Sequence, residues 1–162
     1  MGSVRVVRIV SGGQTGADRA ALDAALEAGL EYAGWCPSGG WAEDLPEPPG
    51  LLAQYPGLRE APSADPEVRT RLNVRDSHAT LVVRAAHVPS LGTDLTVETA
   101  GALGRPCLVT DGSVDEVRHW LEGLGHGLTL NVAGPRESEQ PGLYAVARVL
   151  LDALLERGPA PG

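Results

Sequence analysis

The chain has 162 residues, of which 13 are basic and 21 acidic, so its formal net charge is −8 and its sequence pI is near 4.9. This length is typical of one globular domain, and the acidic balance argues against a nucleic-acid partner, which would need a broad positive surface. All 13 basic residues are arginine, which excludes both a lysine Schiff base with pyridoxal phosphate and a complete GxxxxGK[ST] nucleotide loop.

The predicted elements alternate between strand and helix from the N-terminus onward. The β-branched run at 4–10 ends in a glycine loop and favours a buried strand. A helix is predicted over 17–28, ending at Gly29, and a short strand over 32–35. The elements predicted after these are strands over 80–84, 107–110 and 128–132 and helices over 94–103, 114–124 and 143–154.

This alternation requires right-handed crossovers and parallel strands. We therefore predict the α/β class, a Rossmann-like three-layer sandwich with a mostly parallel sheet of about five or more strands, as a single domain over 1–162. The segment 37–66 interrupts the alternation because it holds seven of the 13 prolines. Trp35 and Trp41 at its start favour an ordered flap, and the tail at 158–162 is expected to fray.

The loops that follow strands are the expected ligand-binding positions, because ligands of parallel α/β sheets bind at the carboxyl ends of the strands. The first loop combines glycines with a helix start, so its N–H groups and the helix dipole favour a phosphate. The alternative is a tight turn in which Thr15 or Asp18 caps the helix. The predicted ligand-binding residues of this loop are Ser11, Gly12, Gly13, Gln14, Thr15, Gly16 and Asp18.

Two later loops have similar features. After the strand at 80–84, Gly92, Thr93 and Thr96 stand at a helix start and could donate hydrogen bonds to phosphate, although simple capping explains Thr93 equally well. After the last strand, Arg136 is the expected cation for a phosphate, with a solvated arginine as the alternative. The predicted ligand-binding residues of this third loop are Gly134, Pro135, Arg136, Glu137 and Ser138.

Metal and redox chemistry have little support in the sequence. Cys36 and Cys107 are far apart and form no CxxC pair, and the four histidines are scattered, so no zinc or other metal site is expected. The apolar stretch at the N-terminus is too short for a signal peptide or a membrane span. A cytoplasmic protein without a membrane partner is therefore the expectation.

Five motifs of this chain together resemble those of a known family. They are SGGQTGADRA at 11–20, GWCP at 34–37, AED at 42–44, NVRDS at 73–77 and LNVAGPRES at 130–138. In this order they are similar to the family named "putative molybdenum cofactor carrier", also grouped as circularly permuted YpsA-like proteins of the LOG/SLOG superfamily. The resemblance implies a Rossmann-like fold and a phosphorylated nucleotide- or pterin-type ligand, with molybdenum cofactor (molybdopterin) as the carried molecule.

The chain also departs from the patterns of these relatives. Residues 38–41 are Ser-Gly-Gly-Trp, whereas members of the family commonly have basic residues there. Residue 78 is histidine (His78), whereas an acidic residue is usual at that position. Thr96 stands in place of the glutamate of the LOG-type PGGxGTxxE motif. A hydroxyl cannot replace that carboxylate as a general base at neutral pH, so phosphoribohydrolase activity is not expected.

Several interpretations of function follow and stay open. The first is a carrier that binds its small phosphorylated ligand at the carboxyl edge of the sheet. The alternatives are a nucleotide-processing hydrolase of the LOG type, a sensor of a nucleotide-derived signal, and a purely structural module. The resemblance also leaves a homo-oligomer open, because related folds are often dimers.

Overall fold

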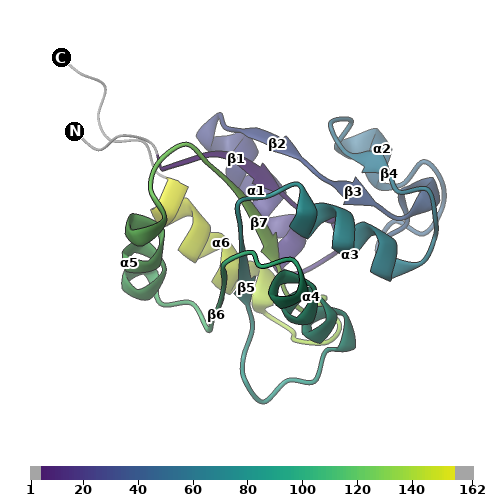
Figure 1. The fold of residues 1–162 in the computed structure, drawn as a ribbon. Helices are drawn as coiled ribbons and strands as arrows, with labels where there is room; N and C mark the ends of the chain where they lie inside the picture. Colours follow the sequence, from purple (N-terminus) through teal and green to yellow (C-terminus); the bar gives the residue numbers. More distant parts are fainter. Residues whose placement is uncertain (1–4, 156–162) are drawn as a thin grey trace.

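A computed structural model describes residues 5–155, and Figure 1 shows their arrangement. Five parallel strands form the main sheet in the order β2-β1-β7-β5-β6. Their bounds are β1 Val6–Val10, β2 Glu31–Ala33, β5 Ala79–Val83, β6 Cys107–Thr110 and β7 Leu128–Ala133. The predicted α/β class and parallel sheet are therefore confirmed.

Helices cover both faces of this sheet, as a three-layer sandwich requires. In Figure 1, α3 (Pro66–Arg75) and α4 (Leu91–Ala102) lie in front of the sheet, while α1 (Ala17–Ala28) and α6 (Leu143–Leu155) lie behind it. Helix α5 (Val114–Leu124) packs beside α6 and β6. Within the described residues, no helix is both long and apolar enough to cross a membrane.

The core behind the sheet is built from small and branched aliphatic side chains. Helix α1 contributes a row of buried alanines, including Ala21 and Ala25, which allows α6 to approach closely with Leu150 and Leu151. All five residues of β5 are buried, as expected of a central parallel strand. Close packing of this kind holds the strand ends, and the loops that follow them, in fixed positions.

The structure differs from the sequence prediction in three places. Helix α4 begins at Leu91, three residues before the predicted start. The predicted strand over 32–35 is two strands, β2 and β3 (Trp35–Cys36), which are separated at Gly34. Gly34 has φ +144°, and a Cβ at this position would overlap the backbone of Ser11. Helix α3 was not predicted. The expected fraying at 158–162 lies outside the described residues.

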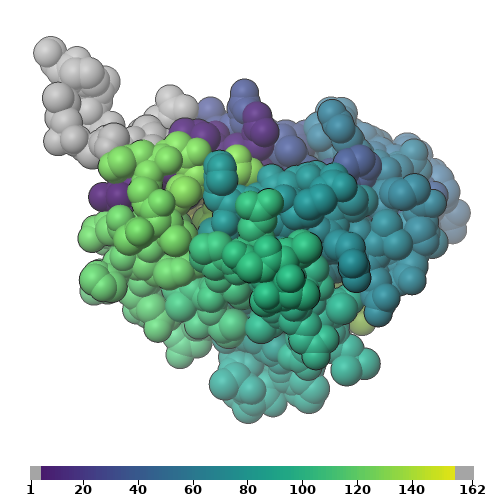
Figure 2. Space-filling view, in the orientation of Figure 1, coloured from purple at the N-terminus to yellow at the C-terminus, as the bar shows by residue number. Residues whose placement is uncertain are grey.

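The proline-rich segment 37–66 is ordered and packs on α1. It contains the short elements η1 (Ser38–Gly40), α2 (Leu51–Gln54) and β4 (Arg59–Glu60), the last of which pairs with β3. A second small core holds it together, formed by Leu22, Cys36, Ala42, Leu51, Tyr55 and Leu58. In Figure 2 the segment, in blue, forms one continuous surface with the neighbouring teal helices.

Candidate functional site

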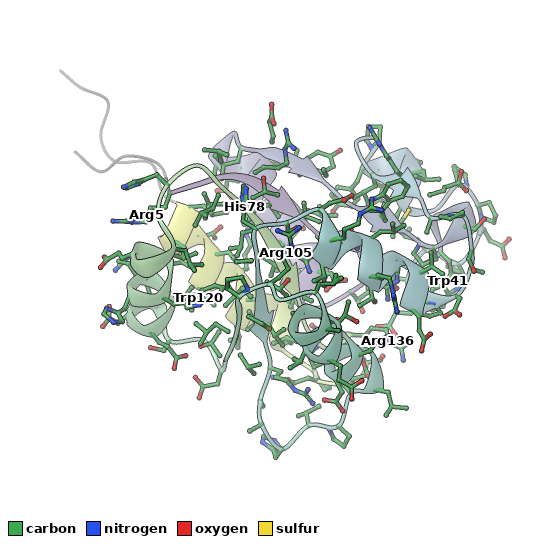
Figure 3. The ribbon with its side chains drawn as sticks, in the orientation of Figure 1. Arg5, Trp41, His78, Arg105, Trp120 and Arg136 are labelled. Atoms are coloured by element: carbon green, nitrogen blue, oxygen red, sulfur yellow. The ribbon has the colours of Figure 1, made fainter. Side chains whose placement is uncertain are left out.

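The loops after β1, β7 and β5 meet because these strands are neighbours in the sheet. The Glu137 N–H donates to Thr15 Oγ1 over 3.0 Å, which joins the loops after β7 and β1. The Ala85 N–H donates to the Gln140 side-chain oxygen over 3.0 Å, which joins the loops after β5 and β7. The predicted convergence of the three loops is confirmed by these contacts. Figure 3 shows Arg136 far from Arg5, which precedes β1 at the opposite edge.

The glycine loop, residues 11–16, uses some of its polar groups internally. The Gly13 N–H donates to Ser11 Oγ over 3.1 Å, and the Gln14 N–H donates to Asp18 Oδ2 over 3.4 Å. These bonds hold the loop in a tight form against the start of α1. The role of its remaining N–H groups in phosphate binding stays a prediction.

Helix α1 starts without a side-chain cap. Its N-cap is Gly16, at φ +80°, and no side chain hydrogen-bonds there. The alternative in which Thr15 or Asp18 caps this helix is therefore wrong. A Cβ at Gly16 would overlap the carbonyl oxygen of Pro135, so glycine is needed here both for its backbone conformation and for the approach of the third loop.

The proline-rich segment covers one side of the glycine loop. A Cβ at Gly13 would lie 3.1 Å from both Leu51 Cδ1 and Leu58 Cδ1. Gln14 Nε2 donates to the Trp41 carbonyl over 2.9 Å, while Gln14 Oε1 is buried without a hydrogen-bond partner. The loop is therefore screened from solvent on this side.

Asp18 carries a buried carboxyl group directly beneath the glycine loop, and the residue is 5% exposed. Burial raises the pKa of Asp18 from its ordinary 3.8 to about 6, although Arg69 and the backbone of Gln14 and Gly134 act in the opposite direction. Near neutral pH this carboxyl is therefore much closer to protonation than an exposed aspartate.

On the other side of the glycine loop lies Arg69, a residue of α3. Its Nε is buried with no hydrogen-bond partner, and the side chain forms no ion pair with any described residue. Burial lowers the pKa of Arg69, opposed by the nearby Asp18 carboxyl. Arginine remains charged despite such shifts, so this is a largely buried cation without a direct counterion.

Two contacts direct Arg69 onto the glycine loop. One turn along α3, Asn73 accepts from the Trp35 N–H over 2.8 Å and donates to the Trp35 carbonyl over 3.0 Å, which fixes α3 against β3. A Cβ at Gly12 would lie 2.5 Å from Arg69 Nη1 and 3.1 Å from Asp18 Oδ2. The guanidinium and the carboxyl therefore converge at Gly12, where the missing side chain leaves room.

The second loop satisfies most of its hydroxyl groups locally. Ser90 caps α4 by accepting from the Thr93 N–H over 3.4 Å, and the two side-chain oxygens lie 2.7 Å apart. Thr96 Oγ1 donates to the Gly92 carbonyl over 3.1 Å. The cap of α4 is therefore Ser90, whereas Thr93, the residue that capping was expected to explain, lies inside the first turn of the helix. Phosphate binding by Thr93 and Thr96 stays a prediction.

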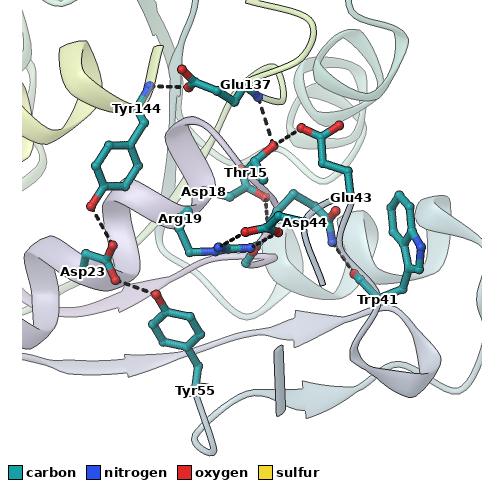
Figure 4. A network of polar contacts seen from close by, with 12 residues as sticks. Thr15, Asp18, Arg19, Asp23, Trp41, Glu43, Asp44, Tyr55, Glu137 and Tyr144 are labelled. Atoms are coloured by element: carbon teal, nitrogen blue, oxygen red, sulfur yellow. Dashed lines mark hydrogen bonds and ion pairs between the residues drawn. The ribbon is translucent and has the colours of Figure 1, made fainter. Parts of the chain in front are cut away.

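Arg136 in the third loop lies between two carboxylates. Its Nη1 is 3.8 Å from Glu43 Oε2, and its Nε is 3.5 Å from Glu139 Oε1. Glu43 belongs to the proline-rich segment and also accepts hydrogen bonds from Thr15 (Figure 4) and from Ser138. Ligand binding by Arg136 stays a prediction, and in this state its charge is already balanced.

Further contacts fix the proline-rich segment to α1, as Figure 4 shows. Arg19 donates to both carboxylate oxygens of Asp44, over 2.8 and 2.9 Å. Asp23 accepts from the hydroxyls of Tyr55 and Tyr144, each over 2.6 Å. Opening of this predicted flap would have to break the bonds of Asp44 and Tyr55, whereas the Tyr144 bond joins α1 to α6. Movement of the flap stays a prediction.

A groove of about 780 Å³ lies elsewhere, beside the edge strand β2. None of the predicted ligand residues lines it. Its charged groups have partners within the protein, since Arg8 pairs with Glu31 over 2.9 Å and Arg59 lies over the Trp35 ring. We therefore place the candidate site at the strand-end loops. Within residues 5–155, no group of three or more His, Cys, Asp or Glu residues is placed to hold a metal ion.

Sequence reasoning missed Arg69 because it missed α3. The signal was Asp65 followed by Pro66, since Asp65 caps the helix by accepting from the Glu67 N–H over 2.9 Å and proline occupies the first turn. Arg69 and Asn73 then share one helix face at i, i+4 spacing. The apolar periodicity of this helix is too weak to have revealed it.

The comparisons with known proteins agree on a family. Residues 9–155 match the model of the circularly permutated YpsA SLOG family. The chain is 35% identical to a protein from Syntrophus aciditrophicus SB whose crystal structure is titled "Putative molybdenum carrier protein". That similarity covers 95% of this chain and 98% of the other, with a TM-score of 0.84. A search of curated proteins gave no match.

Proposed function

The chain belongs to the circularly permuted YpsA SLOG family, and on that premise we propose that it binds a phosphorylated nucleotide- or pterin-type ligand at the carboxyl edge of its sheet. The observation that carries the proposal is Arg69, a largely buried cation at the glycine loop that forms no direct ion pair with any residue the structure describes. An anionic group beside Gly12 would supply the missing partner.

Energetics favour a ligand at this position. A buried charge without a partner is costly, and a charge-assisted hydrogen bond to an anion is worth roughly 1.5–3 kcal/mol. The guanidinium presents paired donors that match the oxygens of a phosphate. Arg136 lies near enough to lower the pKa of Arg69 by repulsion, so an anion between them would be attracted by both.

We favour carriage over hydrolysis. Thr96 donates its hydroxyl proton to the Gly92 carbonyl and offers no carboxylate for base catalysis. The Syntrophus protein is named a molybdenum carrier, and a pterin cofactor that bears a phosphate would suit the same anion site through that phosphate. The cargo proposed for this chain is accordingly molybdopterin or a related phosphorylated compound, with cytoplasmic location and a small-molecule partner as parts of the same proposal.

The test begins with the protein as purified. Small molecules released by denaturation are identified by mass spectrometry, and the affinity for AMP and for the released compound is measured by calorimetry. We expect Arg69→Met to weaken binding by roughly ten- to a hundredfold, from the loss of one charge-assisted bond. The control is Arg71→Met, which removes the same charge from an exposed position on the same helix.

Two results would contradict the proposal. One is wild-type protein that releases no phosphorylated compound and binds none. The other is equal loss of affinity in the Arg69 and Arg71 variants, which would indicate a general effect of charge. Thermal unfolding of each variant establishes that the fold is retained.

A further inference from the structure

The carboxylate of Glu43 lies where three segments of the chain meet. Glu43 comes from the proline-rich segment, whereas its partners come from the loops after β1 and β7. Thr15 donates its hydroxyl to Glu43 Oε1, and Ser138 donates its hydroxyl to Oε2 over 2.6 Å and its N–H to Oε1 over 3.3 Å. Arg136 Nη1 lies 3.8 Å from Oε2. We call Thr15, Arg136 and Ser138 the Glu43 donor set.

This donor set is arranged around a negative charge. Partial burial acts to raise the pKa of Glu43, but the hydrogen bonds from Ser138 and Thr15 outweigh it and hold the pKa below its ordinary value. Thr15 keeps its hydroxyl proton directed at Glu43, because the same oxygen accepts from the Glu137 N–H over 3.0 Å. Glu43 is therefore ionised at neutral pH.

Carboxylates and phosphates are recognised by the same kinds of donor. A phosphate group offers more acceptor oxygens than Glu43 and carries up to twice its charge. The neighbouring Glu139 carboxylate, 3.5 Å from Arg136 Nε, would oppose an incoming anion, and it remains whether or not Glu43 leaves. Displacing Glu43 removes one of the two negative charges that now balance Arg136.

The residues near Glu43 are attached to α1 and to the glycine loop by their own bonds. Asp44 pairs with Arg19 over 2.8 Å, and the Trp41 carbonyl accepts from Gln14 over 2.9 Å. Within residues 5–155, the Glu43 side chain has hydrogen bonds and ion pairs only with the donor set. Its carboxylate is therefore the part of this segment that a competing anion can replace.

We propose that the Glu43 donor set is a second anion subsite, which the protein fills with its own carboxylate until a diphosphate-bearing ligand displaces it. This inference rests on the proposed function: one phosphate of the ligand would bind beside Arg69 and Gly12, and the other would bind the donor set in place of Glu43. Such a ligand carries two adjacent anionic groups, and Arg69 and Arg136 lie within electrostatic range of each other. A ligand with a single phosphate would leave Glu43 in place.

The experiment compares Glu43→Gln with Glu47→Gln, using pyrophosphate and inorganic phosphate as probes in calorimetry at low salt. Glu47 is an exposed glutamate of the same segment with the same charge. We expect Glu43→Gln to bind pyrophosphate about tenfold more tightly than wild type, because a competing charge is removed. Glu47→Gln should match wild type. Adding Ser138→Ala to Glu43→Gln should abolish most of the gain.

A second measurement needs no variant. Hydrogen–deuterium exchange of residues 38–58 is followed in wild-type protein with and without saturating pyrophosphate, and we expect faster exchange because the Glu43 anchor is lost. Unchanged or slower exchange overturns the inference, as does a Glu43→Gln affinity equal to that of wild type. If wild type binds nucleotides under either of these outcomes, the proposed function stands and only the displacement of Glu43 fails.

Discussion

Substitution of Gly12 by alanine tests the anion site without altering any charged residue. Gly12 lies outside the left-handed backbone region, so alanine fits its conformation. The new Cβ would lie 2.5 Å from Arg69 Nη1, 3.1 Å from Asp18 Oδ2 and 3.5 Å from Asn73 Nδ2. The nearest of these atoms is the end of a long, flexible side chain. We therefore expect Arg69 to swing away while the fold is retained.

The two expected effects differ in size. Replacing a glycine by alanine, where the backbone conformation suits alanine, stabilises a protein by roughly 0.4–1 kcal/mol because the unfolded chain has less conformational entropy to lose. Here this gain offsets part of the steric cost of placing the new Cβ against Arg69. Moving the guanidinium by an ångström or more breaks its bond to the ligand, worth roughly 1.5–3 kcal/mol. Gly12→Ala should therefore bind AMP about ten- to a hundredfold more weakly than wild type, with its unfolding free energy changed by no more than about 1 kcal/mol.

Calorimetry with AMP and urea unfolding measure the two quantities on the same samples. The control is Gly101→Ala in α4, where no heavy atom lies within 4 Å of the added Cβ and the backbone is helical. It should gain up to about 1 kcal/mol of stability and keep its affinity. A folded Gly12→Ala protein that binds AMP as tightly as wild type would refute the placement of the anion beside Arg69.

Three further predictions concern neighbouring groups. In the pH profile of the unfolding free energy, the contribution of Asp18 should fall by up to about 3 kcal/mol between pH 4 and pH 7, because Asp18 has a pKa of about 6 when folded and about 3.8 when unfolded and so loses a stabilising proton over this range. Asp18→Asn should flatten this profile in urea unfolding, and an identical profile would show that Asp18 is not responsible. AMP incubated with the protein should release no adenine by chromatography, since Thr96 replaces the expected carboxylate; release that disappears on mutating Glu98 would favour the hydrolase. Arg136→Ala should weaken pyrophosphate binding roughly tenfold or more at low salt, and Arg136→Lys should recover part of the affinity. An unchanged dissociation constant for Arg136→Ala would show that Arg136 is a solvated arginine that does not bind the ligand.

Most of the architecture was predictable because its signals are local. Helices α1 and α5 have the bounds expected from the sequence, and α6 differs by one residue at its end. Strand β6 also matches at both ends. Apolar periodicity and the residues that end helices act over a few positions, so a single sequence carries them. The alternation of strands and helices then predicts a parallel sheet. Because the carboxyl ends of parallel strands share one edge, it also predicts that the loops after them meet.

The partners of the charged residues could not be predicted in this way. Sequence reasoning selected Arg136 as the cation because it follows a strand in a glycine-proline loop, yet Glu43, which is 93 positions away, lies against it. Arg69 stands in a helix with a weak periodic signal, and only the packing of α3 on β3 through Asn73 brings it to Gly12. Electrostatic attraction depends on distance in space, and the spacing of these groups is determined only when all layers are packed.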